Sequence, residues 1–366
     1  MGGVNLVHDY LYVYGGAERM LEHAHLIWPH APLFTLMYLR DRLPESFKRM
    51  DVRSTWVNRL PARRRLQRAY AMLQPLAFAA VRPYGNVVSF ASFGAKAVRA
   101  RSGTHVCYCF TPPRFLWGPH RGLRQDALPL GARTAVRPLE AGLRRWDHAV
   151  AQRVDAFITM TDYVAERVRR VYGRTSEVLP PPVDVNRFLE QPVRDDGYFL
   201  ALGRFEAYKR FDLAIQACQH VGVPLRIVGG GVADPALRRL AARSAHVELL
   251  GELPDRAVAE QLAGCRALLF PGEEDFGLTA VEAQAAGKPV IAYAEGGACE
   301  TVVEGHTGTF FAELTADSLA QAIREFEPSA FSAGACRQNA RRFAPDSFRV
   351  RFKETVERLW DTGRVA

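Results

Sequence analysis

Two glutamates, Glu274 and Glu282, carry the most informative chemistry of this 366-residue sequence. They lie in EEDFGLTAVEAQAAGKPVIA, residues 273–292, between an apolar run that ends at Phe270 and another that begins at Val290. Helix formers closed by a glycine separate the two runs, so the pattern predicts a strand, a short loop, a helix and a second strand. Parallel sheets bind ligands at the carboxyl ends of their strands and beside helix amino termini. Because carboxylates accept hydrogen bonds from vicinal hydroxyls, the two glutamates indicate a polyhydroxylated ligand there.

Two cations follow another predicted strand, Tyr198–Leu202. Arg204 and Lys209 stand in GRFEAYKRFDLAIQA, on the loop that leads into a helix. A planar guanidinium and a mobile ammonium at this place can together neutralise a diphosphate. Neither pair is decisive alone. Glu282 would also suit a solvated face of a helix, and Glu274 would suit a helix amino terminus. The two cations would also suit an ordinary solvated surface.

The segment around Glu274, with its Phe276–Gly277 step and its AQAAGKPVIA continuation, resembles the carboxy-domain signature of family-4 retaining glycosyltransferases. These enzymes have the GT-B fold, an α/β architecture in which two Rossmann-like domains face each other across a cleft. The resemblance covers nearly the whole chain. It implies that Glu274 contacts hydroxyls of the donor sugar, that Glu282 binds the nucleotide ribose, and that the two cations stabilise the leaving nucleoside diphosphate. The catalytic candidates are therefore Arg204, Lys209 and Glu274, and the substrate-binding candidates of this domain are Phe276, Gly277, Leu278 and Glu282.

A glycine pair follows the first predicted strand, Val4–Val7. Gly15 and Gly16 stand in LYVYGGAERMLEHAH, between that strand and a predicted helix. The pair suits a phosphate loop, in which glycine lets the backbone approach a ligand, and equally a simple tight turn. In the resembling family this loop approaches the donor diphosphate and the acceptor, which makes both glycines substrate-binding candidates. Asp9, just before the loop, is a further candidate for contact in the cleft.

The stretch TPPRFLWGPH places Arg114 among aromatic residues on an extended path, and we count it as a substrate-binding candidate. This part most resembles bacterial polysaccharide mannosyltransferases, which usually have histidine where this chain has Phe110. If that histidine contacts the sugar or the acceptor, Phe110 removes the contact and leaves open an altered specificity or a reduced activity. His105 or His120 would be candidate replacements, and each also suits a strand end or a surface.

The length suits two domains, each large enough to bury its own core. We predict an amino-terminal Rossmann-like acceptor-binding domain over residues 1–190 and a carboxy-terminal Rossmann-like nucleotide-sugar donor-binding domain over residues 191–345. Three consecutive prolines in EVLPPPVDVNRF suit a stiff connector and place a hinge near residues 185–197. In the resembling family the last helix, here residues 346–366, packs back on the first domain.

The net charge of +9 is unevenly distributed. Residues 1–190 hold 28 basic and 15 acidic side chains, hence +13, and residues 191–366 hold 20 and 24, hence −4. A basic surface can meet nucleic acid, anionic lipid or a phosphorylated acceptor. Because no nucleic-acid-binding motif accompanies it, we expect one of the last two and no nucleic acid. Residues 59–81, rich in arginine and leucine, suit peripheral contact with an anionic membrane, or a domain helix with a solvated basic end.

Other classes of site are not indicated. The six cysteines show no C-x-x-C spacing and the ten histidines no metal-ligand pattern, so we expect no metal and no other cofactor. No stretch approaches the roughly twenty apolar residues that a membrane-spanning helix needs. The amino terminus lacks the features of a signal peptide. We therefore expect a cytoplasmic protein, with peripheral contact at the inner face of the cell membrane as an option.

The sequence thus predicts a metal-independent retaining glycosyltransferase that moves a hexose from a nucleotide diphosphate sugar to a lipid-linked or polysaccharide acceptor. Mannose from GDP-mannose is the preferred donor, on the resemblance alone. Two alternatives stay open. A nucleotide-sugar epimerase of the same fold would convert the donor without transfer, and a non-catalytic accessory subunit would bind it without turnover. Phe110 motivates the second alternative.

Overall fold

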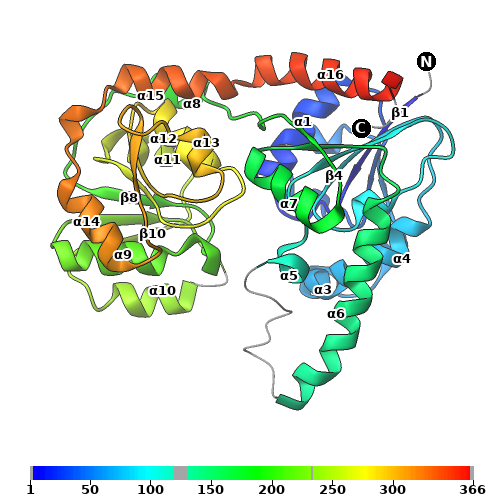
Figure 1. Ribbon diagram of the computed structural model, residues 1–366, viewed down its shortest axis with the longest axis horizontal. Coiled ribbons are helices and arrows are strands. Elements are labelled where there is room, and N and C mark those ends of the chain that lie inside the picture. Colours follow the sequence, from blue (N-terminus) through cyan, green and yellow to red (C-terminus); the bar gives the residue numbers. More distant parts are fainter. Residues whose placement is uncertain (1–2, 119–129, 232–233, 363–366) are drawn as a thin grey trace. The chain divides into compact units, whose positions relative to one another are not determined.

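The computed structural model describes residues 3–118, 130–231 and 234–362, and the chain forms two compact units (Figure 1). Unit 1 comprises Met1–Pro181 and Phe348–Ala366, and unit 2 comprises Pro182–Ser347. Each unit has one parallel β-sheet with helices packed on it, which is the predicted Rossmann-like α/β architecture. The sequence placed the boundary after residue 190. In the structure, α8 (Asn186–Leu189) already packs on helices of unit 2, because Phe188 is fully buried there.

The sheet of unit 1 has seven parallel strands in the order β3-β2-β1-β4-β5-β6-β7. Its central strands are continuous apolar runs because helices cover both faces. The strands are β1 Val4–His8, β2 Leu33–Thr35, β3 Val52–Ser54, β4 Asn86–Ala91, β5 His105–Cys109, β6 Ala156–Thr159 and β7 Glu177–Val178. The helices are α1 Gly16–Ile27, α2 Glu45–Lys48, α3 Arg63–Tyr70, α4 Gln74–Ala79, α5 Arg114–Trp117, α6 Leu130–Ala151 and α7 Asp162–Tyr172.

The basic stretch 59–81 is not one helix. It forms α3, a 3-10 turn at Ala71–Leu73 and then α4, in which Pro75 occupies the first turn. Proline is tolerated there because the N–H that it lacks would have no partner within the helix.

The last helix, α16 (Pro345–Thr362), buries Phe348, Phe352, Val356 and Leu359 at helical spacing. Its part in unit 1 places Phe352 against the rings of Phe90 and Tyr108, at centroid distances of 5.9 and 6.1 Å. The carboxy-terminal residues thus complete the aromatic core of unit 1.

The sheet of unit 2 has six parallel strands in the order β10-β9-β8-β11-β12-β13. The strands are β8 Phe199–Leu202, β9 Leu225–Val228, β10 Val247–Gly251, β11 Leu268–Phe270, β12 Val290–Tyr293 and β13 Gly308–Phe311. The other helices are α9 Phe211–Val221, α10 Asp234–Ala241, α11 Asp255–Gly264, α12 Leu278–Ala285, α13 Ala298–Thr301, α14 Ala316–Glu325 and α15 Ala333–Ala340. Fully buried strand residues such as Ile227 and Ile291 pack with Ile215 of α9 and Leu319 of α14 in one core.

Each sheet contains one point where the strand order reverses. In unit 1 the chain runs outward from β1 to β3 and then returns to lay β4 on the other side of β1. In unit 2 it runs from β8 to β10 and returns to lay β11 on the other side of β8. Open α/β sheets bind ligands beyond the carboxyl ends of the strands at this reversal, which we call the switch point of each unit.

Candidate functional site

An ion pair occupies the switch point of unit 2. Nζ of Lys209, on the loop after β8, lies 2.5 Å from Oε1 of Glu274, on the loop after β11. The two side chains are 9% and 16% exposed, so the pair is largely buried and still reaches solvent. The structure therefore brings together two of the three predicted catalytic residues.

Glycines let the two loops approach each other. A Cβ atom on Gly272 would lie 2.5 Å from the carbonyl oxygen of Tyr208 and 2.7 Å from Cα of Lys209, distances that real Cβ atoms do not reach. Gly203 has a φ of +141° and a Cβ there would lie 3.1 Å from the Lys209 stem. Side chains at these positions would push the ammonium away from Glu274.

A third loop supports the backbone of Glu274. Its carbonyl oxygen accepts a hydrogen bond of 2.8 Å from the N–H of Gly297, in the turn between β12 and α13. A Cβ on Gly297 would lie 2.4 Å from Cα of Phe276, and Gly296 has a φ of +81°. The backbone of Glu274 and Phe276 is thus packed against the turn that follows the neighbouring strand, β12.

The amino terminus of α12 faces the same end of the sheet. Gly277 caps this eight-residue helix with a φ of +95°, and Leu278 is its first residue. The N–H groups of a first helical turn have no acceptor within the helix, and together with the helix dipole they favour an anion. In that turn, Oγ1 of Thr279 is buried and has no hydrogen-bond partner within the described residues. Thr279 is not among the residues predicted from the sequence.

Glu282, one turn further along α12, pairs with an arginine that the sequence analysis missed. Its Oε1 lies 3.6 Å from Nη2 of Arg187 on α8, and Nη1 of that arginine lies 2.5 Å from Oδ2 of Asp255 on α11. The Glu282 side chain is 13% exposed, so its carboxylate is held and also accessible. Arg187 lies 95 positions away in sequence, and spacing could not indicate it.

Arg204 lies exposed on the same loop as Lys209, and the structure shows no ion pair between it and Glu274. Arg210, next to Lys209, has a φ of +51° and a bidentate contact with Asp212. A left-handed conformation costs a non-glycine residue about 1 kcal/mol or more, and such strain gathers at functional sites.

In unit 1, the predicted glycine loop leads into α1. Gly15 caps the helix in an extended conformation, and its N–H donates to Oε2 of Glu18 at 2.9 Å. Oε1 of the same buried glutamate lies 3.1 Å from Nε2 of His8. Glu18 thus ties Gly15 and the first helical residue, Gly16, to the end of β1. Glu18 was not predictable from the sequence, because a glutamate in a first helical turn is common.

Asp9 closes the switch point of unit 1. Its buried carboxylate accepts hydrogen bonds from the N–H groups of Ser92, Phe93 and Ala95, at 2.8, 3.0 and 2.7 Å. The observed role of Asp9 is to fix the chain that follows β4 against the end of β1. Substrate contact by Asp9 stays a prediction.

Phe110 directly follows β5 and lies beside His8, with the two rings edge to face at a centroid distance of 6.3 Å. His105 cannot take the place of the missing histidine, because it begins the same strand and lies at the opposite edge of the sheet. It is fully buried and bonds Oγ of Ser89 at 2.7 Å, and this burial lowers its pKa to about 4. His120 lies outside the described residues.

Arg114 is the first residue of α5 and half-buried. The indole of Trp117 on the same helix donates to Oδ2 of Asp147 at 2.8 Å, and the hydroxyl of Tyr172 donates to the same oxygen at 2.8 Å. Oδ1 of Asp147 lies 2.6 Å from Nζ of Lys96, with both side chains fully buried. Burial disfavours the Lys96 charge, but Asp147 outweighs it and the pKa of Lys96 is raised. This buried pair anchors the helix that carries Arg114. The sequence pattern did not predict the pair.

Within the described residues, no group of three or more histidine, cysteine, aspartate or glutamate side chains could hold a metal ion. Metal independence of the reaction stays a prediction. The same part of the chain contains no helix that is both long and apolar enough to cross a membrane.

A family of known proteins matches most of unit 2. Residues 184–343 match the family described as "Glycosyl transferases group 1", and this range covers most of unit 2 with all four charged candidates of that unit. The chain is 29% identical over 258 residues to a D-inositol 3-phosphate glycosyltransferase of Nocardiopsis dassonvillei, covering 62% of this chain and 59% of the relative. It is 27% identical over 249 residues to a GDP-mannose-dependent alpha-(1-6)-phosphatidylinositol monomannoside mannosyltransferase of Mycolicibacterium smegmatis, covering 60% and 62%. The chain thus spans less than two thirds of the length of these curated relatives.

Solved structures extend the likeness to both units. HepE of Anabaena, crystallised in complex with UDP, superposes with a TM-score of 0.72 at 18% identity and covers 98% of this chain and 100% of that one. A sucrose-phosphate synthase of Thermosynechococcus elongatus superposes with a TM-score of 0.76 at 16% identity and covers 99% and 100%. The protein has the GT-B fold of two Rossmann-like domains, as the sequence predicted.

Proposed function

We propose that the protein is a glycosyltransferase that transfers a hexose from a nucleoside diphosphate sugar. The observation that carries the proposal is the Lys209–Glu274 pair at the switch point of unit 2, beside the amino terminus of α12. Cations, free helical N–H groups and an accessible carboxylate there suit a ligand with phosphate at one end and hydroxyls at the other. The match of residues 184–343 to a glycosyltransferase family supports the same activity.

In this proposal, Lys209 and the first turn of α12 bind the diphosphate, and Arg204 folds onto it from the exposed loop. Negative charge grows on the diphosphate as the bond to the sugar breaks. Cations already in place therefore stabilise the transition state more than the bound donor. Glu274 accepts hydrogen bonds from the sugar hydroxyls, and its partner Lys209 becomes shared with the phosphate.

Glu282 would bind the ribose hydroxyls from the next turn of α12. Its Arg187 partner orients the carboxylate, and the second partner of that arginine, Asp255, holds the guanidinium in place. A carboxylate accepts strong hydrogen bonds from hydroxyls.

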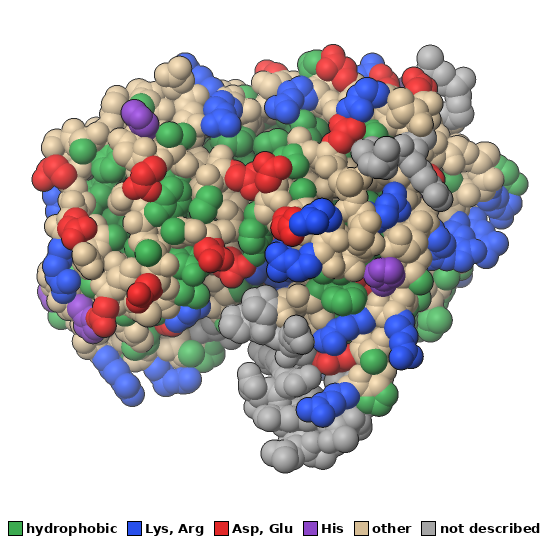
Figure 2. All heavy atoms as spheres, viewed as in Figure 1, with side chains coloured by type: hydrophobic (Ala, Val, Ile, Leu, Met, Phe, Trp, Pro, Cys, Tyr) green, Lys and Arg blue, Asp and Glu red, His purple; other side chains and the backbone are tan. Residues whose placement is uncertain are grey.

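We further propose a retaining, metal-independent reaction, GDP-mannose as the donor and a lipid-linked or polysaccharide acceptor. The named activity of the Mycolicibacterium relative supports this choice of donor and of a lipid acceptor. The charge of the amino-terminal residues supports an anionic acceptor or membrane surface. On the face shown in Figure 2, lysine and arginine side chains are frequent over unit 1 and acidic ones over unit 2.

Contact with an anionic membrane through α3 is part of the proposal. Arg63 and Arg64 of this helix already contact Asn58 and Asp41, and Leu66 is exposed. Sedimentation with anionic liposomes should weaken when Arg63, Arg64 and Arg65 are replaced by serine. Failure of the unchanged protein to sediment at any salt concentration would remove this element.

The activity is tested with a panel of nucleotide sugars in the presence of EDTA, with lipid extract as a source of acceptor. Wild type is compared with Lys209→Ala, Glu274→Ala and the control Glu260→Ala, which removes an exposed carboxylate on α11. We expect one donor to be turned over by wild type and the control, and not by the other two variants. Binding without turnover would favour an accessory subunit, with Phe110→His as the next variant. Conversion of the donor sugar without transfer would favour an epimerase.

A further inference from the structure

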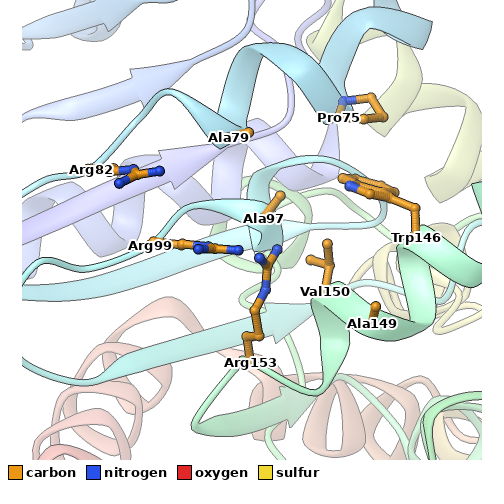
Figure 3. A pocket seen from close by; sticks show the side chains of 9 residues that line it. All are labelled: Pro75, Ala79, Arg82, Ala97, Arg99, Trp146, Ala149, Val150 and Arg153. Carbon is orange, nitrogen blue, oxygen red and sulfur yellow. The ribbon is translucent and has the colours of Figure 1, made fainter.

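A cavity of about 380 Å³ opens in unit 1 between α4 and α6 (Figure 3). Its apolar walls come from Pro75 and Ala79 of α4 and from Trp146 and Val150 of α6. Leu139, two helical turns before Trp146 on the same face of α6, is exposed outside the cavity lining. The cavity therefore offers an apolar surface to a ligand.

Three arginines line the rest of the cavity: Arg82, Arg99 and Arg153. Figure 3 shows the guanidinium groups of Arg99 and Arg153 turned toward each other. Partial burial and the neighbouring Arg99 charge lower the pKa of Arg153, as expected for two cations that face each other without an intervening anion. Within the described residues, none of the three guanidinium groups has an ion pair or a side-chain hydrogen bond. The lining contains no acidic residue, and Asp155, two positions after Arg153, accepts a hydrogen bond from the N–H of His105.

The three arginines lie at the end of the sheet opposite the switch point of unit 1. Arg82, Arg99 and Arg153 each come shortly before the first residue of a strand, namely β4, β5 and β6. Parallel strands place their first residues at one edge of the sheet and their last residues at the other. Gly15 and Arg114 follow strand ends, so they belong to the opposite edge. An anion held by these guanidinium groups would therefore lie at the other end of the sheet from Gly15 and Arg114.

We infer that this cavity binds a phosphate group joined to an apolar body. Guanidinium groups match phosphate oxygens with paired hydrogen bonds, and converging cations without a counter-charge favour an anion. The indole of Trp146 and the flanking proline and aliphatic side chains would contact the apolar part. The same chemistry could come from a soluble phosphate ester or from a phospholipid headgroup. The glycosyltransferase proposal does not depend on this site.

The test uses the full chain and calorimetric titration with monohexyl phosphate and with inorganic phosphate. Wild type should bind the hexyl ester more tightly than inorganic phosphate, and added salt should weaken both. The double variant Arg99→Gln/Arg153→Gln should lose at least about tenfold in affinity, as expected when two charge-assisted hydrogen-bonding groups are removed. Arg137→Gln, on the same helix as Trp146 and outside the cavity, should bind like wild type.

A second pair of variants covers the case in which the double variant misfolds. Ala149, exposed on α6, also lines the cavity. Ala149→Glu places a carboxylate among the guanidinium groups and should abolish binding. Ala149→Gln, of equal size and without charge, should retain more of it. Equal binding by these two variants would contradict the inference.

Vesicles of phosphatidylcholine with and without phosphatidic acid separate the two sources. Sedimentation only with phosphatidic acid, lost in the Arg99→Gln/Arg153→Gln variant, assigns the site to a lipid headgroup. Hexyl phosphate binding without sedimentation assigns it to a soluble ester. The inference is overturned if wild type binds neither probe, or if both the arginine variant and Ala149→Glu bind like wild type.

Discussion

At the switch point of unit 1 the carboxylate of Asp9 accepts three backbone hydrogen bonds, whereas at that of unit 2 the carboxylate of Glu274 meets the ammonium of Lys209. Backbone N–H groups are fixed by the fold, so Asp9 has little freedom to exchange its partners. A lysine ammonium ends a flexible stem, and a ligand can take part of its charge. One sheet uses its switch point to close itself, and the other leaves there a charge pair that a ligand can enter.

Each unit also has an ion pair between a lysine and an acidic residue, and the two pairs differ in burial. Lys96 and Asp147 in unit 1 are fully buried, and Lys209 and Glu274 in unit 2 are 9% and 16% exposed. A buried ion that loses its partner has no water to replace it, whereas a partly exposed one can be hydrated. The first pair should therefore matter for folding, and the second for the reaction.

The largest expected effect is that of Asp147→Asn on the stability of unit 1. It leaves the Lys96 ammonium buried without a counter-charge, which should cost about 3–5 kcal/mol. All five tryptophans of the chain lie in unit 1, so tryptophan fluorescence during urea unfolding reports that unit. Asp361→Asn, at an exposed position on α16, is the control. A loss as small as that of the control would show that the pair does not hold α5 and α6 in place.

Lys209→Met should have the opposite effect to Asp147→Asn, a large loss of activity and a small loss of stability. We expect kcat to fall about 10²- to 10³-fold, because in the proposed reaction this charge stabilises the leaving group. The free energy of unfolding of unit 2, followed by hydrogen exchange, should fall by less than that of unit 1 in Asp147→Asn, since Glu274 reaches solvent and can be hydrated. A large loss of stability with unchanged kcat would show that this pair stabilises the fold as Lys96–Asp147 does. It would contradict the difference that we expect between the two pairs.

His105 should make the stability of unit 1 depend on pH. The described part of unit 2 contains no comparable buried histidine. Burial lowers its pKa to about 4, against 6.5 when unfolded, so between these values the unfolded chain binds the extra proton. Stability should be complete above pH 6.5 and about 3 kcal/mol lower once the pH has fallen to 4. Urea midpoints from tryptophan fluorescence between pH 7 and 4 check this. His105→Asn should remove this part of the slope whatever its own stability, and identical slopes would contradict the assignment.

The sequence predicted what is local. β11 ends at Phe270 and β12 begins at Val290, where the apolar runs predicted these limits, and α12 lies between them as predicted. Strands that are buried on both faces leave a continuous apolar run in the sequence. The charge partners of the site were not predictable in the same way. Arg187 meets Glu282, and Lys96 meets Asp147, across sequence separations that no periodicity spans. A lysine or an aspartate in sequence indicates a solvated surface, and only the fold shows that these two are buried.

The smallest effect we expect comes from a single methyl group at the switch point of unit 2. The Cβ in Gly272→Ala would collide with backbone atoms of Tyr208 and Lys209, so the loop after β8 must move away from Glu274. Overpacking of this kind costs about 1–3 kcal/mol. Gly334→Ala on α15, where a Cβ meets only a side-chain oxygen at 3.4 Å, is the control. Donor affinity and hydrogen exchange in residues 203–210 should change in the first variant and not in the second. If Gly272→Ala binds donor like wild type, the contact between the loops is not what positions Lys209, and the open switch point must be held by its third loop, around Gly297, alone.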